Sequence, residues 1–299
     1  MRFDSRVFLF AILFATACTP ISLSDSQTLN VVASSQIVGD VVRVIAGDLA
    51  EVTFLIPPGT DPHAYEPSPQ DARMLAEADI VFINGLGLEE ALQPLLDEQA
   101  GKVVNVSEGV QPLELVEEVE AGEDPHVWMN PLNVKIWTDN IAKALGEADS
   151  ANALAYSSNT QAYKAEVDEL DAWAVEQIGQ ISEENRVLVT DHESFGYFAD
   201  RYGFEIVGTL IPSYSTLSEP SAGELAELEK AIQDLGVKAI FVGVSLNPSL
   251  AQRVAEDTGV LLVPVYTESL GGPDGLAPTY LAMIRFDVES IVAALSDDS

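Results

Sequence analysis

Short apolar runs rich in β-branched residues alternate along the chain with stretches in which apolar residues recur every three or four positions. The first pattern predicts buried strands and the second predicts amphipathic helices. In the first half, strands are expected at 30–35, 51–56, 80–83 and 102–106, with helices at 37–46, 69–78 and 89–98 between them. This alternation implies a parallel sheet built from right-handed crossovers.

The second half of the chain repeats the pattern. Strands are expected at 186–190, 204–210, 238–242 and 260–265, and helices at 195–202, 221–235, 248–258 and 280–295. The helix at 221 begins with a capping box, Ser221-Ala222-Gly223-Glu224, and stops at Gly236. The predicted fold class is therefore α/β, with two lobes that each contain a roughly four-stranded parallel sheet flanked by helices.

A long helical pattern separates the two halves. One helix is expected from 131 to about 146, and a second runs from about 151 to about 181, with apolar residues such as Tyr163, Val167 and Leu170 on one face. At about 1.5 Å per residue, the second helix would be about 45 Å long. We therefore expect a rigid linking helix at 149–182, between an N-terminal lobe at 29–148 and a C-terminal lobe at 183–299.

Composition and charge narrow the function classes. The 299 residues, 47% of them hydrophobic, suffice for two domains with buried cores. The chain carries 48 acidic and 14 basic residues and a net charge of −34, which would repel nucleic-acid phosphates and anionic membrane surfaces. No nucleic-acid partner is expected. A solvated acidic surface is favoured over attraction of cations as the reason for the charge.

The N-terminal segment has the pattern of a signal peptide. Arg2 and Arg6 precede the apolar run 7–17, which is too short to span a bilayer and ends at Cys18, the only cysteine. A single cysteine excludes an internal disulfide and a thiolate metal cluster. Ala15-Thr16-Ala17-Cys18 resembles a bacterial lipobox, which predicts cleavage after residue 17 and a lipid on Cys18. Residues 18–28 would then tether the protein to a membrane, in the periplasm or on the outer face of the cytoplasmic membrane.

All three histidines of the chain lie in polar loops that follow predicted strands. His63 and His126 each stand in an Asp-Pro-His sequence, and His192 follows the apolar run 186–190. Histidines without a shared function would be expected on helix faces and scattered surface positions. This placement indicates a metal site, since imidazole nitrogens suit zinc and its neighbours among the first-row metals.

Four motifs, in this order, resemble the cluster A-I solute-binding proteins, the zinc and manganese receptors of ABC importers. The motifs are 61–67 (DPHAYEP), 124–131 (DPHVWMNP), 190–198 (TDHESFGYF) and 266–270 (YTESL). The resemblance runs from about Leu29 to the end of the last helix. It implies two lobes joined by one helix and a metal ion as cargo. It also implies an ABC permease and its ATPase as partners, and a binding protein rather than an enzyme; we expect a monomer.

The candidate metal ligands are His63, His126, His192 and Glu268. In open parallel sheets, ligands bind outside the carboxyl ends of the strands. His63, His192 and Glu268 lie a few residues past such ends, and His126 follows the loop after the fourth strand, so two candidates from each lobe would meet in the cleft. Three neutral imidazoles and one carboxylate fill four positions around a divalent ion. A filled coordination sphere favours holding the ion over activating a water molecule.

Zn²⁺ is the first choice of cargo, with Mn²⁺ or iron as alternatives. Three imidazoles favour zinc, because the harder Mn²⁺ prefers more oxygen ligands. The resemblance agrees, since the manganese receptors of this family typically place glutamate where His192 stands. It also shows a departure, because most relatives have aspartate at the position of Glu268. A zinc hydrolase and an adhesin with a structural metal are the competing functions.

Several residues near these motifs have simpler structural roles. Asp61 and Asp124 are expected to form turns rather than to orient the histidines, and Glu193 to favour the start of a helix. The loop at 107–123 is acidic, whereas relatives often carry a histidine-rich loop there, and it is interpreted as a solvated excursion. Relatives also often have glutamate where this chain has Gly243.

Overall fold

The computed structural model describes residues 28–113 and 123–296 of the chain. The expected signal peptide at 1–17, Cys18 and nearly all of the tether at 18–28 lie outside the described residues, as does 114–122 of the acidic loop. Among the helices that are described, none has both the length and the apolar composition that crossing a membrane requires.

The N-terminal lobe is built on a four-stranded parallel sheet with the strand order β2-β1-β3-β4. The strands are β1 (Leu29–Ala33), β2 (Ala50–Phe54), β3 (Ile80–Ile83) and β4 (Val103–Asn105). The helices between them are α1 (Gln36–Ala46), α2 (Pro69–Glu77) and α3 (Gln93–Asp97). Helix α2 starts where the sequence predicts, because Ser68 and Asp71 form a capping box and Pro69 occupies the first turn.

The C-terminal lobe repeats this order, as β6-β5-β7-β8, with all strands parallel. Its strands are β5 (Val187–His192), β6 (Glu205–Ile211), β7 (Ala239–Gly243) and β8 (Leu261–Val265). Its helices are α6 (Gly196–Tyr202), α7 (Ala222–Leu235), α8 (Ser249–Thr258) and α9 (Tyr280–Leu295). The predicted α/β class, with two parallel sheets of four strands each, is confirmed.

Both sheets are buried on both faces. Val31 and Ala33 of β1 belong to the large apolar cluster under α1 and α4, whereas Val32 between them packs toward α2 and α3. In β7, Phe241 belongs to the same large cluster, whereas Ile240 packs in the layer under α7 and α8. This accounts for the near-continuous apolar runs in the sequence, since parallel strands covered by helices on both sides need no polar face.

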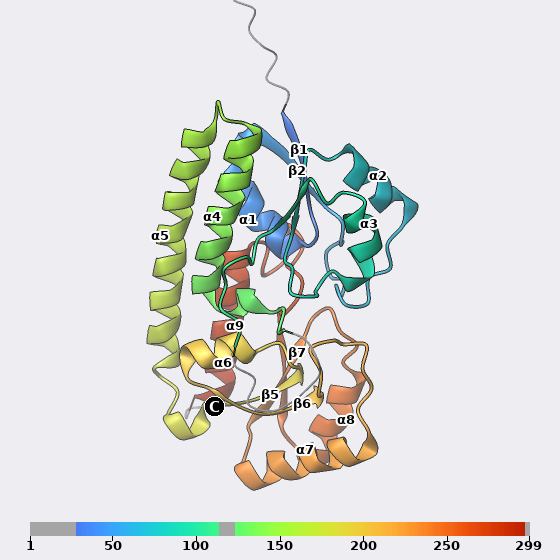
Figure 1. The fold of residues 1–299 in the computed structure, drawn as a ribbon. Helices are drawn as coiled ribbons and strands as arrows, with labels where there is room; N and C mark the ends of the chain where they lie inside the picture. The colour runs from blue at the N-terminus through green and yellow to red at the C-terminus, as the bar shows by residue number, and fades with distance from the viewer. Residues whose placement is uncertain (1–27, 114–122, 297–299) are drawn as a thin grey trace, which may run out of the picture.

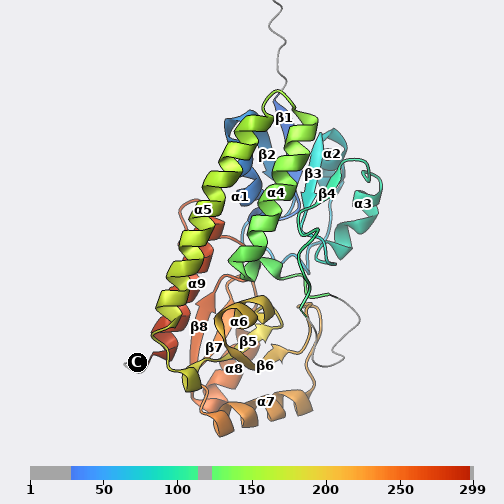
Figure 2. The same cartoon turned by 60° about the vertical axis from the view of Figure 1, so that its left-hand side comes forward.

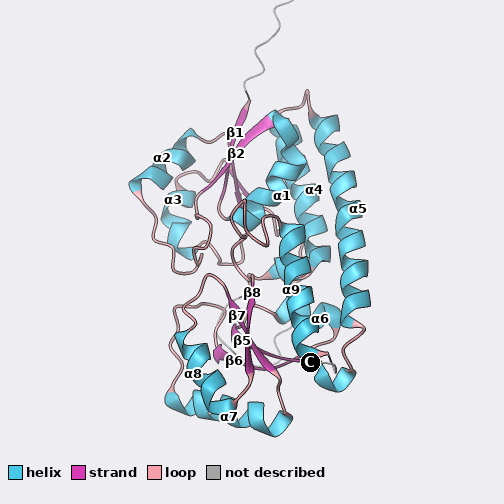
Figure 3. Ribbon diagram, turned by 180° about the vertical axis from the view of Figure 1, so that it is seen from behind, coloured by secondary structure: helices cyan, strands magenta, loops and turns pink. Residues whose placement is uncertain are grey.

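One long helix connects the lobes along one side of the molecule (Figures 1 and 2). Helix α4 (Pro131–Ala148) leads into α5 (Ala153–Ile178), whose 26 residues span about 39 Å and reach the C-terminal lobe. Helix α9 runs beside α5 and extends to α1, as the view from behind shows (Figure 3). The expected linking helix is therefore present, but one apolar cluster continues through both lobes, with α9 as a second element across the junction.

The predicted helix at 89–98 is shorter in the structure. A 3₁₀ turn at Glu90–Leu92 comes first, and α3 begins only at Gln93, with Pro94 in its first turn. The buried carboxylate of Glu89 instead accepts hydrogen bonds from the backbone N–H groups of Asn84 (2.7 Å) and Gly85 (3.0 Å). Glu89 therefore closes the turn after β3 and does not open a helix.

Candidate metal site

His63 lies in the loop between β2 and α2. Pro57-Pro58-Gly59 follow the end of β2, and the chain then turns at Asp61, whose Oδ1 accepts a hydrogen bond from the backbone N–H of His63 (2.9 Å). This turn directs the His63 side chain toward the junction of the lobes. Asp61 therefore forms the turn that the sequence predicts.

One carboxylate oxygen, of Asp124, holds both the backbone and the ring of His126. Oδ1 of Asp124 accepts from the backbone N–H of His126 (2.9 Å) and from its ring Nδ1–H (2.8 Å). The next residue but one, Trp128, packs edge-on against the His126 ring at 5.3 Å and donates from Nε1 to the carbonyl of Thr267 (2.8 Å). The loop of His126 is therefore bound directly to the segment that carries Glu268.

His192 is the last residue of β5 and is fully buried. Oδ1 of Asp191 accepts from the backbone N–H (2.7 Å) and from the ring Nδ1–H (2.6 Å) of His192, while its Oδ2 accepts from the backbone N–H of Gly243 on β7. Glu268 follows β8 and is also buried. Strands β5 and β8 both flank β7, so the sheet itself brings these two ligands together.

The four candidate ligands converge on one point between the lobes. One ligand atom from each residue can be chosen so that all lie within 4.8 Å of one another. Oε1 of Glu268 lies 2.7 Å from Nε2 of His192, 3.0 Å from Nε2 of His126 and 3.1 Å from Nε2 of His63. Nε2 of His126 is 3.3 Å from the same atom of both other histidines. The structure thus brings together all four residues that the sequence singles out.

The site concentrates lone pairs, so it needs positive charge at its centre. Burial alone would lower the pKa of His192, but the carboxylates of Glu268 and Asp191 raise it well above its ordinary value. Burial alone would raise the pKa of Glu268, but the imidazoles of His192 and His63 hold it well below its ordinary value. The arrangement therefore favours protons or a cation between these groups, and the two would compete for the same Nε2 atoms.

Three residues behind the candidate ligands have roles that the sequence interpretation ranked lower or did not give. Asp124 forms the expected turn but also orients the His126 ring, a role that the sequence favours less than turn formation. Asp191 orients His192 in the same way and was missed, although its place directly before a histidine was a usable signal. Gly243 donates to Asp191, and a Cβ at this position would lie 2.5 Å from Oγ1 of Thr267. A side chain at position 243 would therefore disturb the supports of His192 and Glu268.

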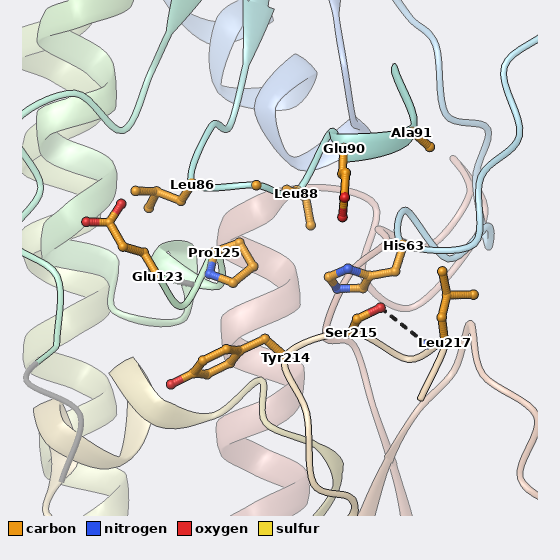
Figure 4. Close-up of a pocket in the computed structure, with 11 residues that line it drawn as sticks. His63, Leu86, Leu88, Glu90, Ala91, Glu123, Pro125, Tyr214, Ser215 and Leu217 are labelled. Carbon is orange, nitrogen blue, oxygen red and sulfur yellow. Dashed lines mark hydrogen bonds between the residues drawn. The ribbon is translucent and has the colours of Figure 1, made fainter. Parts of the chain in front are cut away.

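A pocket of about 460 Å³ opens beside the ligands, and His63 alone of the four lines it (Figure 4). Leu88 and Glu90 of the N-terminal lobe border it on one side, and Tyr214 and Ser215 of the β6–α7 loop border it on the other. The His63 imidazole projects between Glu90 and Ser215. Solvent therefore reaches the candidate site on the side of His63.

The sequence and the fold match known proteins over most of the chain. Residues 31–294 match the family described as zinc-uptake complex component A, periplasmic. The chain is 36% identical to the manganese-binding lipoprotein MntA of Halalkalibacterium halodurans, over 91% of this chain and 90% of the relative. The chain therefore belongs to the zinc-uptake complex component A family.

Solved structures agree with this assignment to the zinc-uptake component A family. The periplasmic zinc-binding protein TroA of Treponema pallidum superposes with a TM-score of 0.83 at 30% identity, covering 89% of this chain and 98% of TroA. A manganese-bound periplasmic metal-binding protein from Candidatus Liberibacter asiaticus gives a TM-score of 0.79 at 31% identity, with the same coverage of 89% and 98%. The expected cluster A-I fold is confirmed, and the family consists of binding components of ABC importers, not of enzymes.

Proposed function

We propose that the protein captures Zn²⁺ outside the cytoplasmic membrane and delivers it to an ABC permease and its ATPase for import. The proposed ligands are His63, His126, His192 and Glu268. The convergence of these four side chains from both lobes, with their ligand atoms within 4.8 Å of one another, is the observation that supports this function. Among the described residues, no second group of this kind is found.

The spacing of the imidazoles supports zinc as the cargo. In a tetrahedral site with bonds of about 2.0–2.1 Å, neighbouring ligand atoms are about 3.3–3.4 Å apart. Nε2 of His126 lies 3.3 Å from Nε2 of His63 and of His192, whereas Oε1 of Glu268 lies closer to the three nitrogens, at 2.7 to 3.1 Å, so the tetrahedral spacing is seen among the imidazoles and not for the carboxylate. The hydrogen bonds from ring Nδ1–H to Asp124 and Asp191 leave Nε2 of those two rings as the atom that binds a metal.

Manganese is the second candidate, and one feature of Glu268 favours it. Oε2 of Glu268 is buried and has no hydrogen-bond partner within the described part of the chain. Both carboxylate oxygens can therefore face a cation, and a second oxygen ligand suits Mn²⁺ better than Zn²⁺. The relatives are named for both metals, manganese in MntA and zinc in TroA.

Titration of the purified protein with Zn²⁺ and with Mn²⁺ in separate experiments tests this proposal. We expect one tightly bound Zn²⁺ per chain, weaker Mn²⁺ binding, and loss of both in a protein with His126→Ala and His192→Ala. Tighter binding of Mn²⁺ than of Zn²⁺ would assign the second candidate. Metal analysis of protein isolated from its native envelope would then identify the physiological cargo.

Removal of the metal tests the alternative of an adhesin with a structural ion. A structural metal site contributes to folding, so chelation would unfold such a protein. Here each lobe has its own apolar layers, and we expect the chain to stay folded in EDTA. A cation present at 100 times its Kd should then stabilise the folded state by about 2.7 kcal/mol. Circular dichroism in EDTA, and thermal unfolding with and without Zn²⁺, measure both effects.

The N-terminal residues would determine where the proposed receptor lies in the cell. We propose that residues 1–17 are removed, that Cys18 carries the lipid, and that 18–28 form the tether. The mature protein would be a monomer with lobes at 29–148 and 183–299 and the linking segment at 149–182. Mass spectrometry of the membrane-extracted protein would detect the lipid on Cys18, and replacing Cys18 with serine should release the protein from the membrane.

A further inference from the structure

The four candidate ligands differ in their access to solvent. The side chain of His63 is 8% exposed, whereas those of His126, His192 and Glu268 are not exposed at all. The pocket of about 460 Å³ adjoins His63 and none of the other three. A cation bound between these residues would therefore have its shortest way to solvent past the His63 imidazole.

The loop that carries His63 is held against the C-terminal lobe by two hydrogen bonds. The backbone N–H of Gly59 donates to Oγ of Ser269 (2.7 Å), and Oγ1 of Thr216 donates to Oδ2 of Asp61 (2.5 Å). The second bond is charge-assisted and lies only two residues from His63. The other oxygen of Asp61 accepts from the His63 backbone, so one carboxylate connects His63 to Thr216.

Thr216 belongs to the loop after β6, which forms the opposite wall of the pocket. This loop is anchored to its own lobe, because the carbonyl of Ser213 accepts from the backbone N–H of Glu193, the residue after His192. Oγ of Ser213 accepts from the N–H of Ser215. Thr216 therefore offers Asp61 a hydroxyl on a fixed support in the C-terminal lobe.

The contacts of His126 across the junction are of a different kind. Trp128 is fully buried, donates to Thr267, and has its carbonyl bonded by the hydroxyl of Tyr280 (2.7 Å). Opening that contact would expose a large aromatic side chain. Opening the contacts of the His63 loop with that lobe would break two hydrogen bonds, that of Thr216 with Asp61 and that of Gly59 with Ser269, and three of these four residues are not buried. Of the His63 and His126 loops, the His63 loop is therefore the one whose displacement from the C-terminal lobe costs less free energy.

We propose that Thr216 is a positioning residue, which holds His63 over the bound cation through Asp61 and thereby sets the rate at which the cation leaves through the adjoining pocket. This inference rests on the proposed function, since it concerns the release of the same cation. Thr216 does not touch the cation. It acts on the His63 loop, so removing the Thr216 hydroxyl should accelerate dissociation of the cation more than it slows association.

Dissociation kinetics of four variants test this role. Protein loaded with Zn²⁺ is mixed with a large excess of a chromogenic chelator, and the rate that no longer depends on chelator concentration is taken as the dissociation rate. Thr216→Val removes the hydroxyl at nearly constant volume, Thr216→Ser keeps it, and Thr216→Ala is a second variant without it. Thr209→Val is the matched control, because the hydroxyl of Thr209 on β6 donates only within its own lobe, to the carbonyl of Ile211 (2.9 Å).

We expect Thr216→Val and Thr216→Ala to release Zn²⁺ about tenfold faster than the unchanged protein, a factor that corresponds to about 1.4 kcal/mol. Thr216→Ser and Thr209→Val should stay close to the unchanged rate, and association should change little in all four. Release by both hydroxyl-free variants at the rate of Thr209→Val would overturn the role of Thr216. Absence of tight Zn²⁺ binding by the unchanged protein would instead refute the proposed function, so the two failures are distinguishable.

Discussion

The two lobes have the same strand order, yet they present their proposed ligands in different ways. In the C-terminal lobe, His192 is the last residue of β5, and Glu268 comes three residues after Val265, the end of β8. In the N-terminal lobe, His63 comes nine residues after the end of β2, and His126 comes 21 residues after the end of β4. The sheet therefore places the C-terminal pair, whereas turns and contacts with the other lobe place the N-terminal pair.

The proposed ligands therefore differ in how firmly the surrounding structure holds them. His192 and Glu268 are fully enclosed, and Asp191 connects His192 to the neighbouring strand β7. His63 lies at a pocket, and its loop is held across the junction by two hydrogen bonds, those of Asp61 with Thr216 and of Gly59 with Ser269. A binding protein must hold its cargo and also release it, and one adjustable ligand on an otherwise preorganised set serves both needs.

The largest effect is expected from removing a ligand of the C-terminal lobe. His192→Ala should reduce Zn²⁺ affinity by more than the factor of about 10–100 that the loss of an outer hydrogen-bond partner typically costs. His63→Ala should cost less, because water from the adjoining pocket can take the vacated position. Isothermal titration of both variants measures the difference. Equal losses, or a larger loss for His63→Ala, would contradict the comparison between the lobes.

The second effect is expected from replacing the aspartates that accept hydrogen bonds from the ring Nδ1–H groups of His192 and His126. Asp191 accepts hydrogen bonds on both oxygens, from His192 and from Gly243, so the amide in Asp191→Asn must turn its NH₂ toward one of these donors. Asp124 uses only Oδ1 for His126, which an asparagine can reproduce. We expect Asp191→Asn to lower Zn²⁺ affinity about 10–100-fold and Asp124→Asn to lower it less. The reverse order in competition titrations would contradict this interpretation.

A graded effect is expected from acidification. Protons compete with the cation for Nε2, and the pKa of His192 is raised well above its ordinary value because the carboxylates of Glu268 and Asp191 outweigh burial. Competition should therefore begin at a higher pH than for a free imidazole, whose pKa is about 6.5, and affinity should fall steadily between about pH 7.5 and about pH 5. Asp191→Asn should move this fall to lower pH. An affinity that is constant over the range would argue against three imidazole ligands.

Local patterns in the sequence were sufficient to predict most of the helices and strands and to single out the three histidines of the candidate site. Apolar runs such as 80–83 and 186–190 report strands that are covered on both faces, and each candidate ligand follows one of these strands. The histidines could be selected because the chain contains only three, all in strand-following loops. Glu268, by contrast, is one of 48 acidic residues and depended on the resemblance of its motif to known receptors.

Contacts between distant segments were not predictable in this way. Nothing near Thr216 in the sequence indicates that it meets Asp61, which lies 155 positions away. The strand order and the place of α9 across the junction likewise depend on which faces pair in three dimensions, and periodicity reports only that a face is buried. Asp191 was missed for another reason: its place directly before His192 could have suggested the role, but the sequence does not show that its carboxylate reaches the Nδ1 side of that ring.

The central claim is that side chains of both lobes bind one divalent cation. A crystal structure of the Zn²⁺-loaded protein, with anomalous difference maps on both sides of the zinc absorption edge, tests it most directly. The account predicts a single peak about 2.0–2.1 Å from Nε2 of His63, His126 and His192, and at bonding distance from Glu268. A peak elsewhere, or one whose coordination sphere contains ligands from only one lobe completed by water, would contradict the account.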